Sequence, residues 1–352
     1  MADTNYGVNH ALAVKTWAKD LYHETLKETF FSRFTGTTSN ALVHVRTEVS
    51  KGPGDQVTVG LRMQLSGSGV QGDATLEGSE EALSTYSDAV VIDQIRHAVR
   101  SNGRMSEQRV PFSVREECRM GLADWYAAKL DQAFFYHLTG ASDVTNTLNT
   151  GNNTTTAPST TSGNTRIIYA DGGSTTEGSL SASQYFQLSY IDQAMLLAKT
   201  ATPAIRPIRY QGGEYYVCFL HPQQVRDMKT DVSTARITWF DAQKARVSGG
   251  EMDNGIFTGA LGIYNNTIIH ESTRIPLAPS ETDVRRAVFC GAQAVTMAYG
   301  QDNASDRMTW VEETFDYGNK LGVSAGMIWG LKKTRFNAND FGSIVIATYS
   351  AS

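Results

Sequence analysis

The 352-residue sequence predicts an α+β fold. The strongest signal is a single helical pattern of about 26 residues between Ser113 and Gly140. Strand-like runs lie on both sides of this helix, at residues 56–64 and in the last third of the chain. The order of strands and helices is too irregular for a doubly wound α/β fold, in which the two alternate.

Composition and charge exclude several classes of protein. Charged residues make up 19% of the chain and hydrophobic residues 41%, so the chain is not a disordered one. The formal net charge of -5 gives no overall attraction to nucleic acid, so we expect only non-specific contact with it. The three cysteines, Cys118, Cys218 and Cys290, form no C-x-x-C motif, and we expect them to be reduced and buried.

The N-terminal residues predict an arm. Apolar residues recur at helical spacing between residues 9 and 33, with charged residues between them. Acidic and basic residues balance over the first 50 residues, whereas helices on membrane surfaces favour a Lys- and Arg-rich polar face. We therefore expect this arm to dock on protein. Without a signal peptide or a long apolar run, we also expect a protein made in a reducing cytoplasm.

The next part predicts a long β-hairpin. Residues 56–64 alternate apolar and polar side chains, and residues 89–95 form a second β-rich run. The connection between them, residues 66–87, is polar and rich in glycine, and it has too little apolar content to bury itself. We expect such an extension to be stable only where something else supports it.

The long helix is followed by a polar segment. Ser113 and Glu116 match the S-x-x-E capping box, and the helix after them would be about 39 Å long. Residues 141–165 consist mainly of Ser, Thr, Asn and Gly, so we expect an exposed loop or a mobile insertion. Replacement of residues 152–162 by a Gly/Ser linker is therefore expected to cost little stability.

The C-terminal half predicts a mixture of helices and strands. We expect a helix over residues 183–199, one opened by Pro222 at its first turn, and one near residues 234–247. The expected strands are residues 214–220, 266–270, 286–289, 308–315, 322–329 and 343–349.

Two motifs that often carry chemistry occur in unsuitable contexts. Gly67, Gly69 and Gly72 form G-x-G-x-x-G, but acidic residues follow instead of a helix, so we expect a flexible hairpin tip and no phosphate site. Residues 322–326 form G-x-S-x-G, but the last histidine, His270, precedes the serine, so a hydrolase triad cannot close in its usual order. The seven histidines never pair at helical spacing. We expect no catalytic, cofactor-binding or metal-binding residues.

The order of these parts resembles that of the major capsid proteins of tailed bacteriophages, which share the Hong Kong 97 fold. Several blocks are also similar to one podophage branch of that family, and together they reach from about Gln56 to Tyr349. These blocks are VTVGLRMQLSGSGVQGDATLEGSEEAL, RVPFSVREECRMGLADWYAAKLDQAFFYHL, YYVCFLHPQQVRDM, GALGIYNNTIIHES, CGAQAVTMAYG and KKTRFNANDFGSIVIATYS.

The resemblance implies how the chain is divided. The expected parts are an N-terminal arm (1–50), the hairpin or E-loop (51–107), the P-domain with its spine helix and the Ser/Thr-rich insertion (108–182), the A-domain (183–299) and strands that return to the P-domain (300–352). In the family the E-loop lies over a neighbouring subunit, which would explain an extension without its own core. No lysine lies between Lys51 and Lys129, so we do not expect the Lys-to-Asn isopeptide bond of some relatives.

The resemblance also implies the function. The chain would be a structural protein of the virion, not an enzyme, that self-assembles as pentamers and hexamers into the icosahedral shell around a phage genome. We expect assembly in the cytoplasm of the host bacterium, with scaffolding, portal and decoration proteins as further partners, and with no cofactor and no membrane. Two alternatives stay open: an encapsulin-type nanocompartment shell of the same fold, and an enzyme of unknown class.

The charge pattern suggests how the hairpin is held. No Lys or Arg lies between Arg62 and Arg96, so the hairpin tip is acidic. The acidic candidates for contacts between subunits are Asp73, Glu77, Glu80 and Glu81, with Asp88 in the same interval. In the family arrangement, the nearest basic candidates are Arg104, Arg109, Arg115 and Arg119, the last two being one helical turn apart. The alternative is that all these charges stay solvated.

Overall fold

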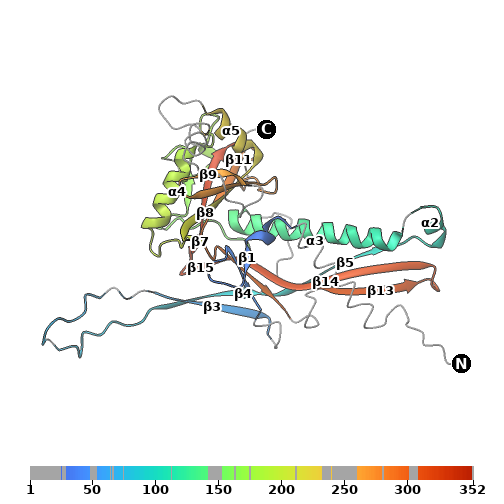
Figure 1. Ribbon diagram of the computed structural model, residues 1–352, viewed down its shortest axis with the longest axis horizontal. Coiled ribbons are helices and arrows are strands. Elements are labelled where there is room, and N and C mark those ends of the chain that lie inside the picture. The colour runs from blue at the N-terminus through green and yellow to red at the C-terminus, as the bar shows by residue number, and fades with distance from the viewer. Residues whose placement is uncertain are drawn as a thin grey trace.

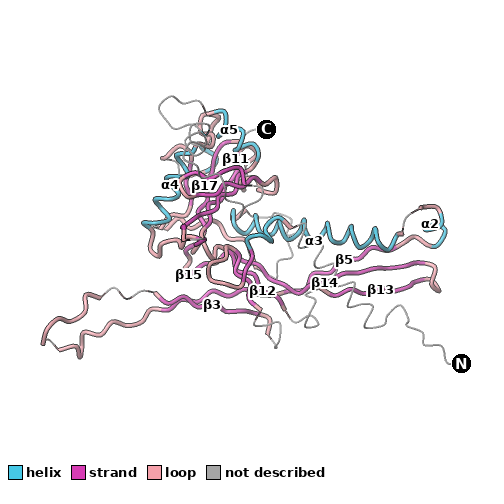
Figure 2. The backbone as a smooth tube through the Cα atoms, in the orientation of Figure 1, coloured by secondary structure: helices cyan, strands magenta, loops and turns pink. Residues whose placement is uncertain are grey.

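The computed structural model shows an elongated chain with three parts (Figure 1). A long hairpin extends to one end, a body of one helix on a sheet extends to the other, and a compact α/β unit stands on their junction (Figures 1 and 2). No helix in the described part of the chain is long and apolar enough to span a membrane. The residues that the structure describes are Thr25, 29–47, 54–63, Leu65, 67–73, 75–111, 113–141, 153–161, 164–173, 176–210, 212–231, Trp239, 260–279, 281–300 and 308–350.

The sheet of the body has six strands. Its order is β1-β2-β12-β14-β13, and β5 also pairs with β14. These strands are β1 (Thr35–Gly36), β2 (Val43–Arg46), β5 (Asp93–Arg100), β12 (Val295–Tyr299), β13 (Thr309–Phe315) and β14 (Lys320–Lys333). β14 is 14 residues long and pairs with β5, β12 and β13 along its length. Segments that are far apart in sequence therefore meet on one strand.

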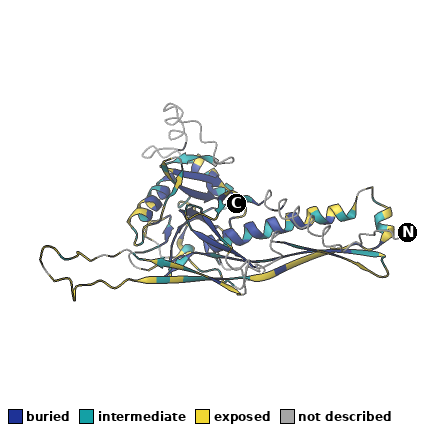
Figure 3. Cartoon of the chain, turned by 60° about the horizontal axis from the view of Figure 1, so that its bottom comes forward, coloured by how far each residue is buried: buried dark blue, intermediate teal, exposed yellow. Residues whose placement is uncertain are grey.

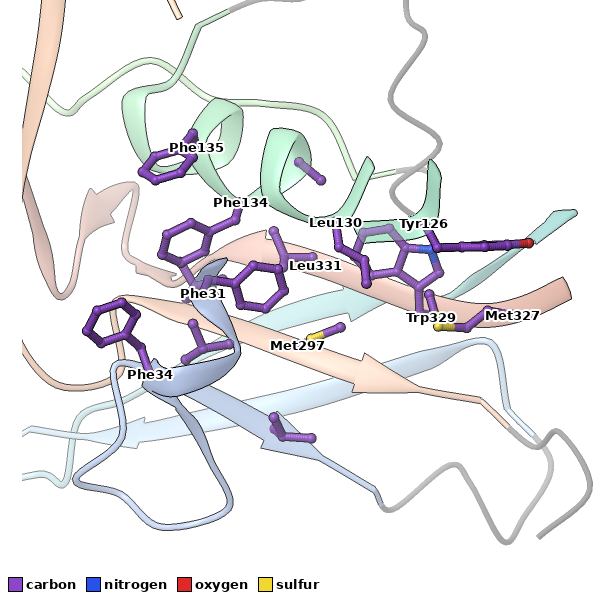
Figure 4. Close-up of a cluster of buried hydrophobic side chains, with 14 of the residues drawn as sticks. Phe31, Phe34, Tyr126, Leu130, Phe134, Phe135, Met297, Met327, Trp329 and Leu331 are labelled. Atoms are coloured by element: carbon purple, nitrogen blue, oxygen red, sulfur yellow. The ribbon is translucent and has the colours of Figure 1, made fainter. Parts of the chain in front are cut away.

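The helix α3 (Val114–Thr139) covers this sheet and confirms the predicted 26-residue helix. Its buried side chains recur every three or four residues, and those of Tyr126, Leu130 and Phe134 point at the sheet (Figure 4). The contact joins Tyr126, Leu130 and Phe134 of the helix to Met297, Met327, Trp329 and Leu331 of the strands, all of them buried. Full burial of one such side chain contributes about 1.5–3 kcal/mol, so this layer is the main core of the body.

The C-terminal end of α3 is formed as expected, and the N-terminal end is not. Ser113 is the N-cap residue, but its side chain makes no capping hydrogen bond, so the predicted capping box is wrong. At the other end Gly140 has a φ of +65°, and its N–H donates to the carbonyl of Tyr136. A side chain at Gly140 would lie 2.4 Å from the carbonyl oxygen of Thr156, so glycine is needed for both its conformation and its packing.

The compact unit is built on a seven-stranded sheet. Its order is β6-β17-β11-β8-β10-β9, and β7 also pairs with β8. These strands are β6 (Ile167–Tyr169), β7 (Ile208–Tyr210), β8 (Gly213–Leu220), β9 (Ala260–Tyr264), β10 (Thr267–Glu271), β11 (Val284–Cys290) and β17 (Ser343–Tyr349). Their buried residues form a second core with the apolar side chains of two helices, α4 (Leu188–Thr200) and α5 (Pro222–Thr230).

Most elements expected in the C-terminal half are confirmed. The six expected strands correspond to β8, β10, β11, β13, β14 and β17, with bounds shifted by a few residues. Pro222 opens α5 as expected, and His221 caps it by accepting the N–H of Gln223 on Nδ1. The helix expected near residues 234–247 lies outside the described residues, apart from Trp239.

The predicted hairpin is also confirmed. β3 (Gln56–Arg62) and β4 (Thr85–Val91) pair in antiparallel register. The second expected run, residues 89–95, is divided at Ile92, because β4 belongs to the hairpin and β5 to the sheet of the body. The short helix α2 (Arg104–Gln108) follows β5 at the opposite end of the molecule from the hairpin (Figure 1). β15 (Arg335–Phe336) and β16 (Asn339–Asp340) form a separate two-stranded ribbon, and η3 (Glu177–Ser179) is a single 3-10 turn.

The described part of the N-terminal segment docks on α3 through a 3-10 helix, η1 (Phe30–Phe34). The backbone N–H groups of Phe30 and Phe31 donate to the two carboxylate oxygens of Asp131, at 3.0 and 3.2 Å. The ring of Phe31 stacks on Phe134 at 5.0 Å. Burial raises the pKa of Asp131, and the two amides oppose that rise. Residues 1–24, which include most of the expected helix, lie outside the described residues.

The expectation of an exposed loop at residues 141–165 is wrong for the part that the structure describes. Ser159 is buried, and its N–H donates to Asp340 Oδ2 at 3.4 Å. Asn153 bonds to the backbone of Val91 through both of its side-chain polar atoms. Composition alone indicated solvation, but these polar groups have partners in the folded chain. A Gly/Ser linker over residues 152–162 would remove structural contacts.

Alanine substitutions at two glycines near α3 are expected to have opposite effects. Gly140→Ala should lower the free energy of unfolding by about 2 kcal/mol or more, because the new Cβ meets backbone and the φ is left-handed. Gly121→Ala, inside α3, should raise it by about 1 kcal/mol, because nothing lies within 4 Å of the added Cβ and alanine favours helix. Urea unfolding of unassembled subunits measures both, and equal effects would contradict the packing of Gly140.

Candidate intersubunit surfaces

The outer part of the hairpin exposes apolar and charged side chains together. Nearly all described residues from 65 to 85 are exposed (Figure 3). Leu65, Leu76 and Leu83 are 57%, 60% and 57% exposed. Single exposed apolar residues are common, but several on one thin extension indicate a contact surface.

The four acidic candidates all lie on this outer part. The carboxylate of Glu80 accepts the N–H of Gly78 at 2.7 Å, and that of Glu81 accepts the N–H of Gly67 at 2.6 Å. These two carboxylates therefore also stabilise the hairpin itself. Asp73 and Glu77 are exposed and make no hydrogen bond or ion pair with any described residue. Their charges are open to a partner outside the chain.

The four arginine candidates divide into two pairs. Arg104 and Arg109 lie at the two ends of α2, are exposed, and have no side-chain partner among the described residues. Arg115, on the first turn of α3, instead pairs with Glu312 of β13 at 2.7 Å, and Glu312 is 3% exposed. Arg119 is partly buried one turn further along. Arg115 already has a partner in its own chain, which no local sequence signal could indicate.

The acidic tip and the α2 arginines lie at opposite ends of the molecule. Figure 1 places the hairpin at one end of the longest axis and α2 at the other. The Debye length at physiological salt is about 8 Å, so the two groups do not interact within one subunit. Any pairing between them therefore requires a second copy of the chain.

The base of the hairpin is fixed to the body by contacts that the sequence did not indicate. Asp88 accepts a hydrogen bond from Lys332 Nζ on Oδ1 and the N–H of Arg335 on Oδ2. Val57 and Val90 pack on Ala298 of β12 in a small apolar cluster. Asp88 therefore belongs to the base of the hairpin and not to its acidic tip.

Asn153 holds the point at which the hairpin meets the body. Its Oδ1 accepts the N–H of Val91 at 3.1 Å, and its Nδ2 donates to the carbonyl of Val91 at 2.8 Å. A residue in a neighbouring strand would make the same pair of bonds. The side chain thus continues the ladder where β4 ends, although it lies 62 residues away in sequence.

A buried ionic group connects the body to the compact unit. Lys333 Nζ donates to Asp340 Oδ2 at 2.8 Å, and both side chains are 1% exposed. Arg166 Nε donates to the carbonyl of Asp340 at 3.1 Å, and Arg335 Nε lies 3.0 Å from Asp340 Oδ1. Burial lowers the pKa of Lys333, and the carboxylate of Asp340 opposes this. Loss of one member would leave an unpaired buried charge at a cost of about 3–5 kcal/mol, so the group fixes this junction.

The residues that could have served in catalysis or metal binding are part of the folded framework instead. Ser324, in the G-x-S-x-G run, lies within β14 and donates to the carbonyl of Val311. Burial raises the pKa of the Cys218 thiol to about 12, which disfavours the thiolate. In the part of the chain that is described, no three His, Cys, Asp or Glu residues gather as a metal site. The exposed groups at the two ends of the molecule are therefore the candidate functional surfaces.

Comparison with protein families gives a match over almost the whole chain. A family model described as phage capsid protein matches residues 5–352. The major capsid protein of Pseudomonas phage KPP25 is 29% identical over an alignment of 359 positions, and 93% of each chain is covered.

Solved structures give the same result. The capsid of Ralstonia phage GP4 is similar with a TM-score of 0.79 and 34% identity, covering 100% of this chain and 99% of that one. The capsid of cyanophage Pam1 has a TM-score of 0.73 at 23% identity, and all of both chains is covered. The α+β fold of the Hong Kong 97 type, expected from the sequence, is confirmed.

Replacement of Asp88 should loosen the hairpin. Asp88→Asn puts an amide group where two acceptor oxygens meet Lys332 and the N–H of Arg335, so we expect a loss of about 1–3 kcal/mol. Hydrogen exchange of β3 and β4 amides in the unassembled subunit should become faster. Asp93→Asn, at an exposed residue whose carboxylate accepts only a local N–H, is the matched control. Unchanged exchange in β3 and β4 would contradict the role of Asp88.

Proposed function

The chain belongs to the phage capsid protein family, and we propose that its copies join head to tail, with the hairpin of one copy lying on the α2 end of the next. It is a major capsid protein that forms the phage head shell. It is a structural protein of the virion and not an enzyme.

The separation of the opposite charges is the observation that carries the head-to-tail arrangement. Asp73 and Glu77 on the hairpin, and Arg104 and Arg109 beside α2, are exposed and lack partners among the described residues. They lie too far apart to pair within one subunit (Figure 1). A neighbour in the shell supplies each group with the opposite charge. Exposed pairs contribute only about 0–1 kcal/mol each, so we assign them to orientation more than to affinity.

We propose the same five parts for the subunit that the resemblance implied, with four strands reassigned by their sheet pairing. Residues 1–50 form the N-terminal arm, 51–107 the E-loop, 108–182 and 300–352 the P-domain, and 183–299 the A-domain. The sheet pairing supports moving β6 and β17 to the A-domain, because both pair in the compact unit. It also supports moving β5 and β12 to the P-domain, because both pair with β14 in the body. The body and the compact unit each have their own buried cluster, which supports a division at this junction.

We also propose that the copies form pentamers and hexamers of an icosahedral shell in a phage of the podophage branch. The six sequence blocks support the branch, and electron microscopy of the virions tests it. A short tail is the expected result, and a long tail would contradict it. Scaffolding, portal and decoration proteins remain proposed partners, and non-specific contact is the proposed relation to packaged DNA.

Charge reversal at the hairpin should weaken assembly, and reversal at α2 should restore it. Asp73→Lys with Glu77→Lys leaves the turn carboxylates Glu80 and Glu81 in place, so the hairpin keeps its own hydrogen bonds. We expect the subunit concentration needed for assembly to rise several-fold at low salt, because like charges then face each other. Adding Arg104→Glu and Arg109→Glu should reverse most of this rise. Light scattering against subunit concentration measures both.

The control variant carries the same change of charge elsewhere. Glu271→Lys with Asp283→Lys alters two exposed residues of the compact unit and should leave the assembly concentration nearly unchanged. Unimpaired shells from the hairpin variant at both low and moderate salt would remove the acidic tip from the mechanism. The charges would then be solvated, as the alternative interpretation of the sequence holds.

A further inference from the structure

A groove opens between the hairpin and the compact unit. Its volume is about 1080 Å³, larger than one side chain requires. Its apolar lining comes from both parts: Leu61, Met63, Leu65 and Leu83 of the hairpin, and Pro203 and Phe341 beside the compact unit. Arg62 and Arg206 also line it, and none of the described residues along its wall is acidic. The groove therefore suits an apolar group that carries a negative charge.

The turn between β13 and β14 carries such a group. Tyr317 is fully exposed, and Asp316 precedes it. Three successive residues, Asp316, Tyr317 and Gly318, have positive φ values of 57°, 50° and 82°. Bulky residues rarely adopt this conformation, in which Asn and Gly are favoured. The tyrosine is thus held in solvent at a position that its own backbone preference opposes, which points to a role outside the isolated subunit.

The groove and the turn lie far apart along the longest axis of the molecule. The groove lies along the hairpin at residues 61–65 and 83, and the β13–β14 turn is beside α2 at the far end of the body (Figure 1). A chain cannot fill its own groove with its own turn. A second copy can, because copies of this protein assemble into a shell.

We propose that the β13–β14 turn of one copy docks in the groove of its neighbour, with the Tyr317 ring against the apolar lining. Asp316 then lies close to Arg62 and Arg206, so the charges are complementary. Tyrosine is well suited to this position, because its ring buries apolar area while its hydroxyl keeps a hydrogen bond. This contact rests on the proposed head-to-tail arrangement and adds an apolar anchor to the charged contact at the hairpin tip.

Site-specific photo-crosslinking tests which surface the ring touches. The photoreactive amino acid p-benzoylphenylalanine replaces Tyr317 in a minority of copies that co-assemble with unchanged subunits. After irradiation of purified shells, mass spectrometry should locate the crosslinks between copies at residues 61–65, 83 or 201–206. The same amino acid at Met105, an exposed residue of α2, is the control and should not label residues 201–206.

The position of the crosslink distinguishes a failure of this docking from a failure of the proposed function. Shells that form normally but carry the label on another Tyr317 turn, or on Leu277 in the groove beside Pro276 and Pro279, would overturn the docking and leave the shell function intact. A labelled groove together with unimpaired assembly of the hairpin charge variant would support the docking and remove only the acidic tip.

The variant Tyr317→Asn provides a second test, in which we expect the stability of the subunit to be kept and its assembly to be weakened. Asparagine adopts the left-handed conformation more easily than tyrosine, so the thermal midpoint of the unassembled subunit should stay equal or rise. The concentration needed for assembly should rise about tenfold, as expected for loss of an aromatic anchor. Leu196→Gln, which removes an exposed apolar residue of α4, should leave the assembly concentration unchanged. Assembly of Tyr317→Asn at the unchanged concentration would overturn the proposal.

Discussion

The packing of α3 on β14 is the contact on which the other parts of this subunit depend. Alternate residues of β14, from Val323 to Leu331, are buried in the same core as α3. Because side chains alternate between the faces of a strand, the two lysines that end β14 point to opposite faces. Lys332 binds Asp88 of the hairpin, and Lys333 binds Asp340 at the compact unit. One strand thus fixes the helix, the hairpin and the compact unit relative to each other.

In this arrangement, both ends of the single subunit expose apolar side chains. A two-stranded hairpin is at best marginally stable alone, and the small cluster of Val57, Val90 and Ala298 holds only its base. At the other end β13 and the turn after it expose Val311, Phe315 and Tyr317. Assembly stabilises such a subunit, because it buries between copies the apolar surface that a single chain leaves exposed.

The sequence predicted the elements whose pattern is local. The bounds of α3 follow from its spacing of apolar residues and from Gly140, and β3 follows from strict alternation. The sequence did not predict contacts between polar groups that are far apart in the chain. Asn153 looks like one more residue of a low-complexity run, yet its side chain binds the backbone of Val91. It also gave no sign of the ion pair between Arg115 and Glu312, because the two lie 197 residues apart in sequence. Composition predicts solvation, and only the fold shows which polar groups have partners.

A shell also requires that the angle between the two ends be fixed. Head-to-tail contacts are heterologous, so the angle between the two contact surfaces decides whether copies close into a ring. In this subunit that angle depends on the base of the hairpin, where Asp88 binds Lys332 and Arg335, and the buried group of Asp340, Lys333 and Arg166 fixes the compact unit beside it. Buried ion pairs add little net stability compared with apolar packing, but they tolerate few alternative geometries. We infer that the apolar core of α3 and β14 provides stability, and that the buried charges determine the geometry that assembly requires.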